Sequence, residues 1–396
     1  MEGTLFVVGG GLKASADEVF SEFIKCAGGK NSRIAFASTA SCLSPDELFD
    51  EFRSRLVKLG VPEENCVKIP LYAKHILDKD NFNAVNGDAD GLCELMKGVS
   101  GVWFSGGDQR NIINAFLRTD GTDTRLMSVL REIYSHGGVI GGTSAGAAVM
   151  SHVMIGGGDN KGVLSSDVLY DYPEADTTED ERAGQPLVLT CGLGFFTQGI
   201  VDQHFNKRAR LLRLIEACLS SRDSVSVGYG VSEDTALVLQ GGTIKVLGSA
   251  SVYIVDCRNA EKPGRGCYRN VKLSAVQRGD IYETKTGRIF FAAGEQGEKM
   301  NAGLDLHMNF IINSPEFDAM INDFVLCADE KSMLRQKSEL YPYAAGGVVY
   351  ASKSELYTVI LRYHKTAETC GYRGRHTSFS GVVLDIDTAV ARGNYL

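Results

Sequence analysis

The sequence predicts an α/β protein whose mostly parallel sheet is covered by helices on both faces. Continuous apolar runs of four or five residues alternate with amphipathic helical segments through the first 150 residues. This alternation is typical of buried parallel strands joined by crossover helices. Glycine- and serine-rich turns follow several of the runs. Because parallel sheets bind ligands at the carboxyl ends of their strands, we expect a functional site at these turns.

The apolar runs predict strands at residues 5–8, 33–37, 66–69, 101–104 and 139–140. Between them, amphipathic periodicity predicts helices at about residues 15–27, 44–59, 92–96, 110–117 and 123–136. Ser15, with Glu18 three residues later, has the pattern of a capping box. Ser44 is followed by a proline and a glutamate at the preferred first-turn positions of a helix.

The chain is less regular beyond residue 150. Residues 156–185 have the composition of a long loop, with six acidic residues between positions 171 and 181. We expect a helix at about residues 206–220. Antiparallel strands are predicted at residues 237–240, 243–247 and 251–255, with a hairpin turn at Gly241-Gly242. The last stretch predicts a helix at 315–324 and short strands such as 356–363, without indicating a chemical role.

Composition and charge limit the possible partners. The 396 residues suffice for two or three domains, and the net charge of −8 argues against nucleic acid or an anionic membrane as partner. A cationic substrate is compatible with this charge. No apolar run is long enough to span a membrane and no signal peptide precedes the first strand, so we expect a cytoplasmic protein. The ten cysteines form no C-x-x-C pair, which favours reduced thiols over a disulfide frame or a zinc site.

A G-x-S-x-G run at residues 142–146 lies between a predicted strand and a helix predicted at residues 145–152. In this context the run is typical of a nucleophile elbow, a sharp turn that exposes a serine hydroxyl at the edge of a sheet. Ser144 is therefore the candidate nucleophile. The N–H of Ala145 and an N–H of Gly106 or Gly107 are candidate donors to an oxyanion. An ordinary glycine-rich turn with an N-cap serine is the alternative.

A serine nucleophile needs a base that is itself oriented by a carboxylate. His204 is the best base among the seven histidines, because it follows an apolar run and polar neighbours surround it. For the carboxylate, Glu233 and Asp202 both stay open on sequence alone. Gly9-Gly10-Gly11 follows the first strand without a phosphate-binding motif, and we interpret it as a close backbone approach near the active cleft.

Three arginines follow His204: Arg208, Arg210 and Arg213. Guanidinium groups near a candidate site indicate recognition of a carboxylate. At helical spacing Arg210 and Arg213 share a face, from which Arg208 points away. A solvated basic helix face is the alternative.

Four segments of the chain combine these candidate residues: FSGGDQ at 104–109, GGTSAGA at 141–147, DQHFNKRARLLRL at 202–214 and SEDTA at 232–236. Together they resemble cyanophycinases, which belong with the peptidase E-like serine peptidases. The run at 202–214 is the most specific. The resemblance covers residues 1–286 and implies a catalytic domain with a class I glutamine amidotransferase-like, flavodoxin-like three-layer sandwich. Residues 287–396 exceed the usual family length and form a C-terminal α+β extension of unassigned role.

The resemblance implies a reaction and a set of site residues. Such enzymes cleave the poly-aspartate backbone of cyanophycin, which carries arginine on each β-carboxyl, and release β-Asp-Arg dipeptides. Ser144 would be the nucleophile, His204 the base and Glu233 the acid, and Glu233 is favoured over Asp202 on this ground. The implied substrate pocket contains Gln109, Asp202, Gln203, Arg208, Arg210 and Arg213. The resemblance implies no metal or organic cofactor, and it suggests a homodimer.

Other functions stay open at this point. A peptidase E-like dipeptidase would use the same serine on aspartyl or isoaspartyl peptides, and a non-catalytic relative would bind the polymer without cleaving it. A glutamine amidotransferase is disfavoured, because the elbow residue is a serine and not a cysteine. We hypothesise that the acidic loop at 171–181 attracts arginine side chains of the polymer, with a solvated loop as the alternative.

Overall fold

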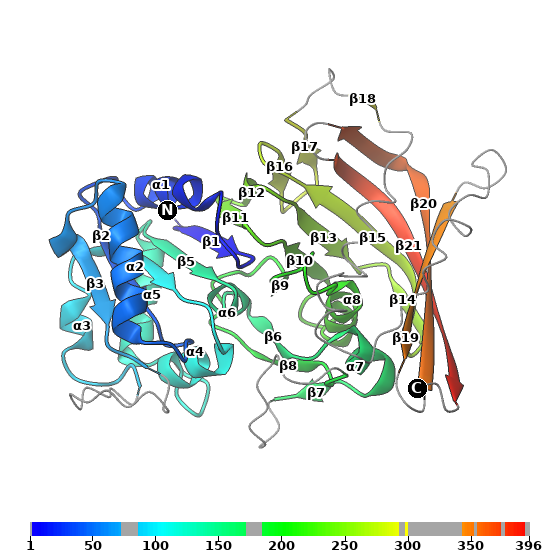
Figure 1. Ribbon diagram of the computed structural model, residues 1–396, viewed down its shortest axis with the longest axis horizontal. Coiled ribbons are helices and arrows are strands. Elements are labelled where there is room, and N and C mark those ends of the chain that lie inside the picture. Colours follow the sequence, from blue (N-terminus) through cyan, green and yellow to red (C-terminus); the bar gives the residue numbers. More distant parts are fainter. Residues whose placement is uncertain are drawn as a thin grey trace.

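The computed structural model describes residues 2–72, 86–171, 184–292, 298–299, 343–351, 355–373 and 377–392. Within these residues the strands form two nine-stranded sheets and one three-stranded sheet (Figure 1). The first large sheet contains the N-terminal strands and several strands from the middle of the chain. The second contains other strands from the middle and those of the C-terminal end.

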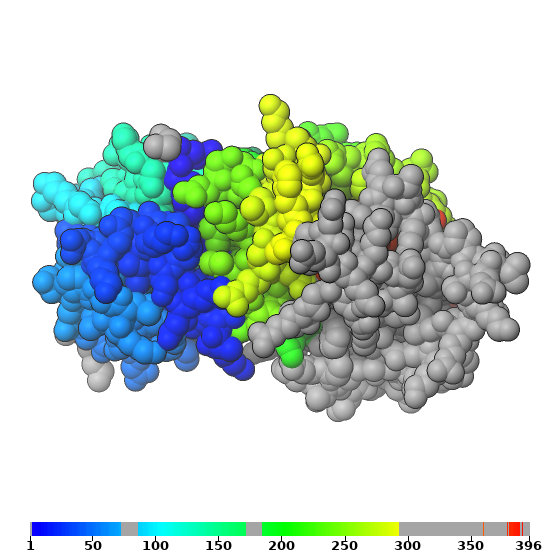
Figure 2. Space-filling model, turned by 90° about the horizontal axis from the view of Figure 1, so that it is seen from above, coloured from blue at the N-terminus to red at the C-terminus, as the bar shows by residue number. Residues whose placement is uncertain are grey.

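The first sheet has the order β17-β16-β12-β11-β1-β5-β4-β2-β3. Its parallel part consists of β1 (Thr4–Val8), β5 (Val139–Thr143), β4 (Val99–Phe104), β2 (Arg33–Ala37) and β3 (Cys66–Ile69). These are the five strands that the apolar runs predict. An antiparallel part adds β11 (Thr235–Gln240), β12 (Thr243–Gly248), β16 (Ile281–Glu283) and β17 (Ile289–Phe290). Figure 2 shows this antiparallel part, green to yellow, packed against the blue N-terminal region.

Helices cover both faces of the first sheet, which confirms the predicted α/β sandwich. One face carries α1 (Ala16–Cys26) and α2 (Pro45–Lys58). The other carries α3 (Leu92–Leu95), α4 (Gln109–Phe116), α5 (Arg125–Ser135) and α6 (Ala145–Ala148). Along β1, Phe6 packs in the core with α1 and α2, whereas Leu5 packs in the core with α4 and α5. This alternation makes β1 a strand buried on both faces.

The two predicted helix caps have different outcomes. The Ser44 hydroxyl accepts the N–H of Glu47 at 3.4 Å at the start of α2, as predicted. Ser15 precedes α1, but its hydroxyl donates to Asp234 instead of capping the helix, so the capping box is wrong. The Asp234 carboxylate also accepts the N–H of Ser15 at 3.0 Å and the N–H of Lys13 at 2.8 Å. A distant carboxylate therefore stabilises the start of α1.

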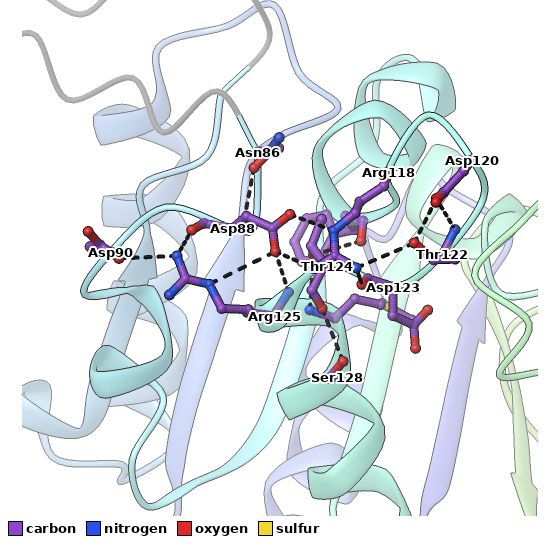
Figure 3. Close-up of polar contacts among 12 residues, drawn as sticks. Asn86, Asp88, Asp90, Arg118, Asp120, Thr122, Asp123, Thr124, Arg125 and Ser128 are labelled. Atoms are coloured by element: carbon purple, nitrogen blue, oxygen red, sulfur yellow. Dashed lines mark hydrogen bonds and ion pairs between the residues drawn. The ribbon is translucent and has the colours of Figure 1, made fainter.

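A polar network fixes the connection between α4 and α5 (Figure 3). The guanidinium of Arg118 makes two hydrogen bonds of 2.8 Å to the Asp88 carboxylate. The backbone N–H of Arg125 donates to the same carboxylate at 2.8 Å. Since α4 begins at Gln109, a predicted site residue, this network holds the far end of a helix that contributes to the site.

The second sheet has the order β18-β20-β21-β15-β13-β10-β9, with β14 beside β15 and β19 beside β20. Only β9 (Ile200–Asp202) and β10 (Val227–Val231) pair in parallel among its described strands. The antiparallel strands are β13 (Val252–Asp256), β14 (Glu261–Gly264), β15 (Cys267–Val276), β18 (Glu298–Lys299), β19 (Tyr343–Ala351), β20 (Glu355–Arg373) and β21 (Thr377–Arg392). Helices α7 (Asn160–Ser165) and α8 (Leu211–Ser220) contribute to one core with it.

The described part of the C-terminal extension completes the second sheet. Strand β21 pairs with β15, and its residues Val382, Leu384 and Ile386 are buried in the same core as α8. The predicted strand at 356–363 lies within β20. The predicted helix at 315–324 lies outside the described residues. A domain boundary at residue 286 stays a prediction.

Two expectations about the secondary structure that follows Ser144 in the chain are wrong. Helix α6 ends at Ala148 instead of continuing to His152, because the carbonyls of Val149 and Met150 accept N–H groups of residues 193 and 196 at 2.6 and 2.7 Å. The expected loop at 156–185 instead contains α7, capped by the Asp159 carboxylate, and part of a small sheet. That sheet consists of β6 (Val153–Gly157), β7 (Leu169–Tyr170) and β8 (Val188–Cys191). Residues 172–183 of the acidic loop lie outside the described residues.

The helix expected at 206–220 begins only at Leu211. His204 and Ala209 have φ angles of 48° and 47°, a left-handed conformation that interrupts a helix. Residues 203–210 therefore form an irregular turn between β9 and α8. Its N-terminal half carries His204, which makes this local irregularity part of the site.

We predict that Leu384→Ala lowers the free energy of unfolding of the whole chain by about 2–5 kcal/mol, because Leu384 of β21 is fully buried in the core that also contains α8. Val390→Ala, at an exposed position of the same strand, is the matched control and should change it by less than about 0.5 kcal/mol. Urea unfolding followed by circular dichroism measures both. A Leu384→Ala protein as stable as the control would mean that the extension does not contribute to this core.

Candidate active site

Ser144 lies on a strained turn between β5 and α6. Its φ and ψ angles are 54° and −114°, values that few non-glycine residues adopt. Such backbone strain costs on the order of 1–3 kcal/mol and is characteristic of functional sites. Gly142 permits the turn, since a Cβ at that position would lie 2.3 Å from the carbonyl oxygen of Gly146. The strand–turn–helix context predicted for the G-x-S-x-G run is therefore present.

His204 follows β9, the edge strand of the second sheet, and reaches across to the first. Its backbone N–H donates to the carbonyl of Gly9 at 2.6 Å. Its side-chain Nε2 lies 2.8 Å from Ser144 Oγ. Ser144 and His204 thus follow strands of different sheets. The loop after β1 connects the two sheets here through the hydrogen bond from His204 to Gly9.

Glu233 completes the chain of contacts. Its Oε1 lies 2.5 Å from His204 Nδ1. Glu233 occupies the short turn between β10 and β11, where the chain crosses from the second sheet to the first. Of the two acids that the sequence leaves open, Glu233 is the one in contact with the imidazole.

The glycines after β1 allow this histidine–carboxylate pair to lie against the backbone. A Cβ on Gly10 would be 2.3 Å from His204 Cε1, and a Cβ on Gly11 would be 2.8 Å from Glu233 Oε2. A Cβ on Gly9 would lie 2.0 Å from the backbone carbonyl oxygen of Ser232. The interpretation of Gly9-Gly10-Gly11 as a close backbone approach is confirmed.

The electrostatic environment keeps the imidazole neutral at neutral pH. Burial lowers the pKa of His204, the contact with Glu233 opposes this, and Arg208 and Arg210 lower the pKa further. The hydrogen bond to His204 holds the pKa of Glu233 below its usual value. Since an ionised carboxylate only accepts, Nδ1 must carry the proton, and Nε2 is left as an acceptor facing the Ser144 hydroxyl. This arrangement can accept a proton from the serine.

Asp202 does not contact His204 but forms a buried ion pair with arginines. Its carboxylate accepts from Arg213 Nε at 2.8 Å and Nη2 at 2.6 Å, and from Arg210 Nη1 at 3.4 Å. Asp202 and Arg213 are 1% and 2% exposed. Arg210 lies before α8, so the two arginines do not share a helical face as predicted, but both contact the same carboxylate of the chain itself. Direct contact of these three residues with substrate stays a prediction.

Gln109 and Gln203 flank the site and are 1% and 2% exposed. Gln109 Nε2 donates to the carbonyl of Gly156 at 2.7 Å. In the described part of the chain, the side-chain oxygens of both glutamines are buried without a hydrogen-bond partner. Buried acceptors of this kind are rare in proteins. Their predicted role in substrate binding is untested.

The candidate oxyanion donors belong to backbone segments that lie close to Ser144. A Cβ on Gly106 would lie 3.2 Å from Ser144 Cβ, so the Gly106–Gly107 peptide passes beside the serine. Gly107 has a φ of 141°, and a Cβ there would meet the carbonyl oxygen of Ala40 at 2.0 Å. The N–H of Ala145 belongs to the residue after Ser144. A donor pair from Ala145 and Gly107, or Ala145 and Gly106, stays a prediction.

Two residues that support the site were missed in the sequence. Asp234 accepts hydrogen bonds from residues 13, 15 and 249, and its N–H donates to Gly10 at 2.9 Å. Asn206 Oδ1 accepts the backbone N–H of Glu233 at 3.0 Å. Both lie inside the motif segments, but their partners are distant in sequence.

The described residues contain no group of three histidine, cysteine or acidic side chains that could hold a metal ion. None of the described helices is long and apolar enough to cross a membrane.

Comparison with known proteins gives the family. The sequence model described as "Peptidase family S51" matches residues 5–247, more than half of the chain. The chain belongs to peptidase family S51. Membership makes it a serine-type peptidase, which confirms the class of enzyme predicted from the sequence.

Curated relatives agree with the S51 assignment. The cyanophycinase of Geminocystis herdmanii (strain PCC 6308) is 30% identical over 298 residues, covering 72% of this chain and 95% of the relative. That of Synechococcus elongatus is 28% identical over 300 residues, covering 73% and 81%. A crystal structure of a peptidase from an acI-B1 actinobacterium aligns with a TM-score of 0.47 and 21% identity, over 72% of this chain and 97% of the other. The family model and the two curated cyanophycinases confirm the resemblance drawn from the four sequence segments.

We predict that reaction of the protein with a serine-directed fluorophosphonate stays fast below pH 6.5, the usual pKa of histidine. The reaction needs a neutral imidazole, and burial lowers the pKa of His204, so the acidic limb of the rate profile should lie below 6.5. Labelling rates measured between pH 4.5 and 8.5 check this. A limb above 6.5 would contradict the environment described for His204.

We predict that Gly10→Ala slows the same labelling reaction by about 100-fold or more, because the new methyl group would occupy the position of the imidazole. Gly29→Ala is the matched control: its φ of 86° is also left-handed, but a Cβ there meets nothing within 4 Å. Both variants should lose about 1 kcal/mol of stability from backbone strain, and only Gly10→Ala should lose reactivity. Equal labelling rates in the two would show that Gly10 does not limit the position of His204.

Proposed function

We propose that this S51 peptidase degrades cyanophycin, hydrolysing the poly-aspartate backbone to β-Asp-Arg dipeptides through an acyl-enzyme on Ser144. The observation that carries the proposal is the continuous contact from Ser144 through His204 to Glu233. The curated cyanophycinases that match most of the chain support the choice of substrate.

The geometry supports acylation of Ser144 as the first step. The Ser144 hydroxyl attacks the carbonyl carbon of an aspartate backbone peptide while His204 Nε2, 2.8 Å away, takes its proton. Glu233 stabilises the imidazolium that forms. The imidazolium then gives this proton to the departing amine, the C–N bond breaks, and the substrate acyl group stays on Ser144 as an ester.

Deacylation uses the same groups in the reverse order. A water molecule attacks the ester while His204 accepts one of its protons, and the proton returns to Ser144 Oγ as the C–O bond breaks. In both tetrahedral intermediates the N–H groups of Ala145 and of Gly107, or alternatively Gly106, stabilise the negative oxygen. Loss of one such donor typically costs on the order of 10²–10³ in rate.

The substrate is a polymer of free and substituted carboxylates that carries many guanidinium groups. The partnerless oxygens of Gln109 and Gln203 are suited to accept hydrogen bonds from such donors. Arg208 lies close enough to His204 to lower its pKa, and a guanidinium at this place would attract a substrate carboxylate toward the serine. Arg210, Arg213 and Asp202 would support the pocket. A cytoplasmic homodimer is part of the same proposal.

The deciding experiment incubates insoluble cyanophycin with the full chain, with Ser144→Ala, and with Ser54→Ala as a matched control at an exposed position of α2. Mass spectrometry follows release of β-Asp-Arg. We expect equal release by the wild type and Ser54→Ala, and a rate lower by about 10⁴- to 10⁶-fold in Ser144→Ala.

Each alternative has its own outcome. Release by Ser144→Ala at the wild-type rate would exclude Ser144 as the nucleophile. If the wild type does not release the dipeptide but hydrolyses isoaspartyl dipeptides, the enzyme is of the peptidase E-like type. If it binds cyanophycin and hydrolyses neither substrate, the non-catalytic alternative holds.

A further inference from the structure

Asn206 connects the two loops that carry the histidine and the acid. It lies two residues after His204, in the irregular turn between β9 and α8, and it is half-buried. Its side-chain Oδ1 accepts the backbone N–H of Glu233 at 3.0 Å. The bond therefore reaches from the loop of the base to the main chain of the acid.

The neighbouring contacts show what this bond adds. The N–H of Phe205 donates to the carbonyl of Val231 at 3.1 Å and brings the two loops together just before the acid. On the other side, the N–H of Asp234 donates to Gly10. Between these two points, the N–H of Glu233 itself is held by a side chain, that of Asn206.

The position of Glu233 is sensitive to such support. Its side chain is 27% exposed, so packing encloses it only partly, and its carboxylate makes a contact of 2.5 Å with His204 Nδ1. The turn that carries it is short and is followed by Asp234 at a φ of 51°. A small rotation of this turn would move the carboxylate away from the imidazole.

We infer that Asn206 is a positioning residue, which holds Glu233 so that its carboxylate orients the imidazole of His204 toward Ser144. The inference rests on the proposed serine chemistry. An uncharged acceptor suits this place, because a carboxylate in the same position would add a negative charge beside Glu233. The groups that face the imidazole are Glu233, Arg208 and Arg210.

The test measures how fast a fluorophosphonate labels Ser144 in the full chain, as a function of pH. The variants are Asn206→Ala, which removes the acceptor, and Asn206→Asp, which keeps an acceptor oxygen. Asn65→Ala is the matched control, since it also removes one hydrogen bond from an asparagine side chain to the main chain, far from the site at the start of β3. Thermal unfolding of each variant is measured alongside.

We expect Asn206→Ala to label about 10- to 100-fold more slowly than Asn65→Ala at pH 7, the loss typical of a misplaced catalytic group. The acidic limb of its rate profile should move to lower pH than in the wild type. The contact with Glu233 raises the pKa of His204, and a weaker contact would raise it less. Asn206→Asp should recover most of the rate, and its limb should move to higher pH because of the added negative charge.

Two results would overturn the inference: labelling of Asn206→Ala at the control rate, or slow labelling with an unmoved pH limb and no recovery in Asn206→Asp. The second pattern, with a lower unfolding temperature, belongs to a residue that only stabilises the fold. A wild type that is not labelled at all would instead overturn the serine chemistry on which the inference rests. Failure to degrade cyanophycin with normal labelling would reject the substrate alone, because the labelling rates still decide the role of Asn206.

Discussion

The glycine loop after β1 is the constraint on which the site depends. Its backbone makes hydrogen bonds with the two loops that carry His204 and Glu233: Gly9 accepts the N–H of His204 at 2.6 Å, and Gly10 accepts the N–H of Asp234 at 2.9 Å. The same loop leaves room for the imidazole and the Glu233 carboxylate only because its residues have no Cβ. Main-chain contacts between the two sheets therefore set the distance between Ser144 and His204. Ser144 follows strand β5 of the first sheet, and His204 follows strand β9 of the second.

Two kinds of charged contact support the site, and they act differently. The partly buried contact between His204 and Glu233 fixes a tautomer and leaves an acceptor on the serine side. The buried contact of Asp202 with Arg210 and Arg213 holds the entry into α8. Losing one partner of such a buried pair typically costs about 3–5 kcal/mol, since the remaining charge is then unpaired. This cost gives the motif at 202–214 a structural role in addition to any role toward substrate.

The C-terminal strands show that an extension need not be a separate unit. Strand β21 adds to β15 by main-chain pairing and buries Leu384 and Ile386 against the core that contains α8. An unpaired β15 would expose an edge that favours association with other chains. The extension thus closes this side of the second sheet and indirectly supports the helix that follows the histidine loop.

The sequence by itself determined the parallel core and the three catalytic candidates. Apolar runs and helix signals gave the five strands, because buried strands and amphipathic helices leave a local pattern. The G-x-S-x-G turn identified Ser144, because its strain is encoded in adjacent small residues. Only the tertiary structure shows that Glu233, and not Asp202, contacts the imidazole, that α6 ends at Ala148, and that Asn206 pairs with Glu233. These outcomes depend on contacts between residues far apart in the chain, and such contacts leave no local period or motif in a single sequence.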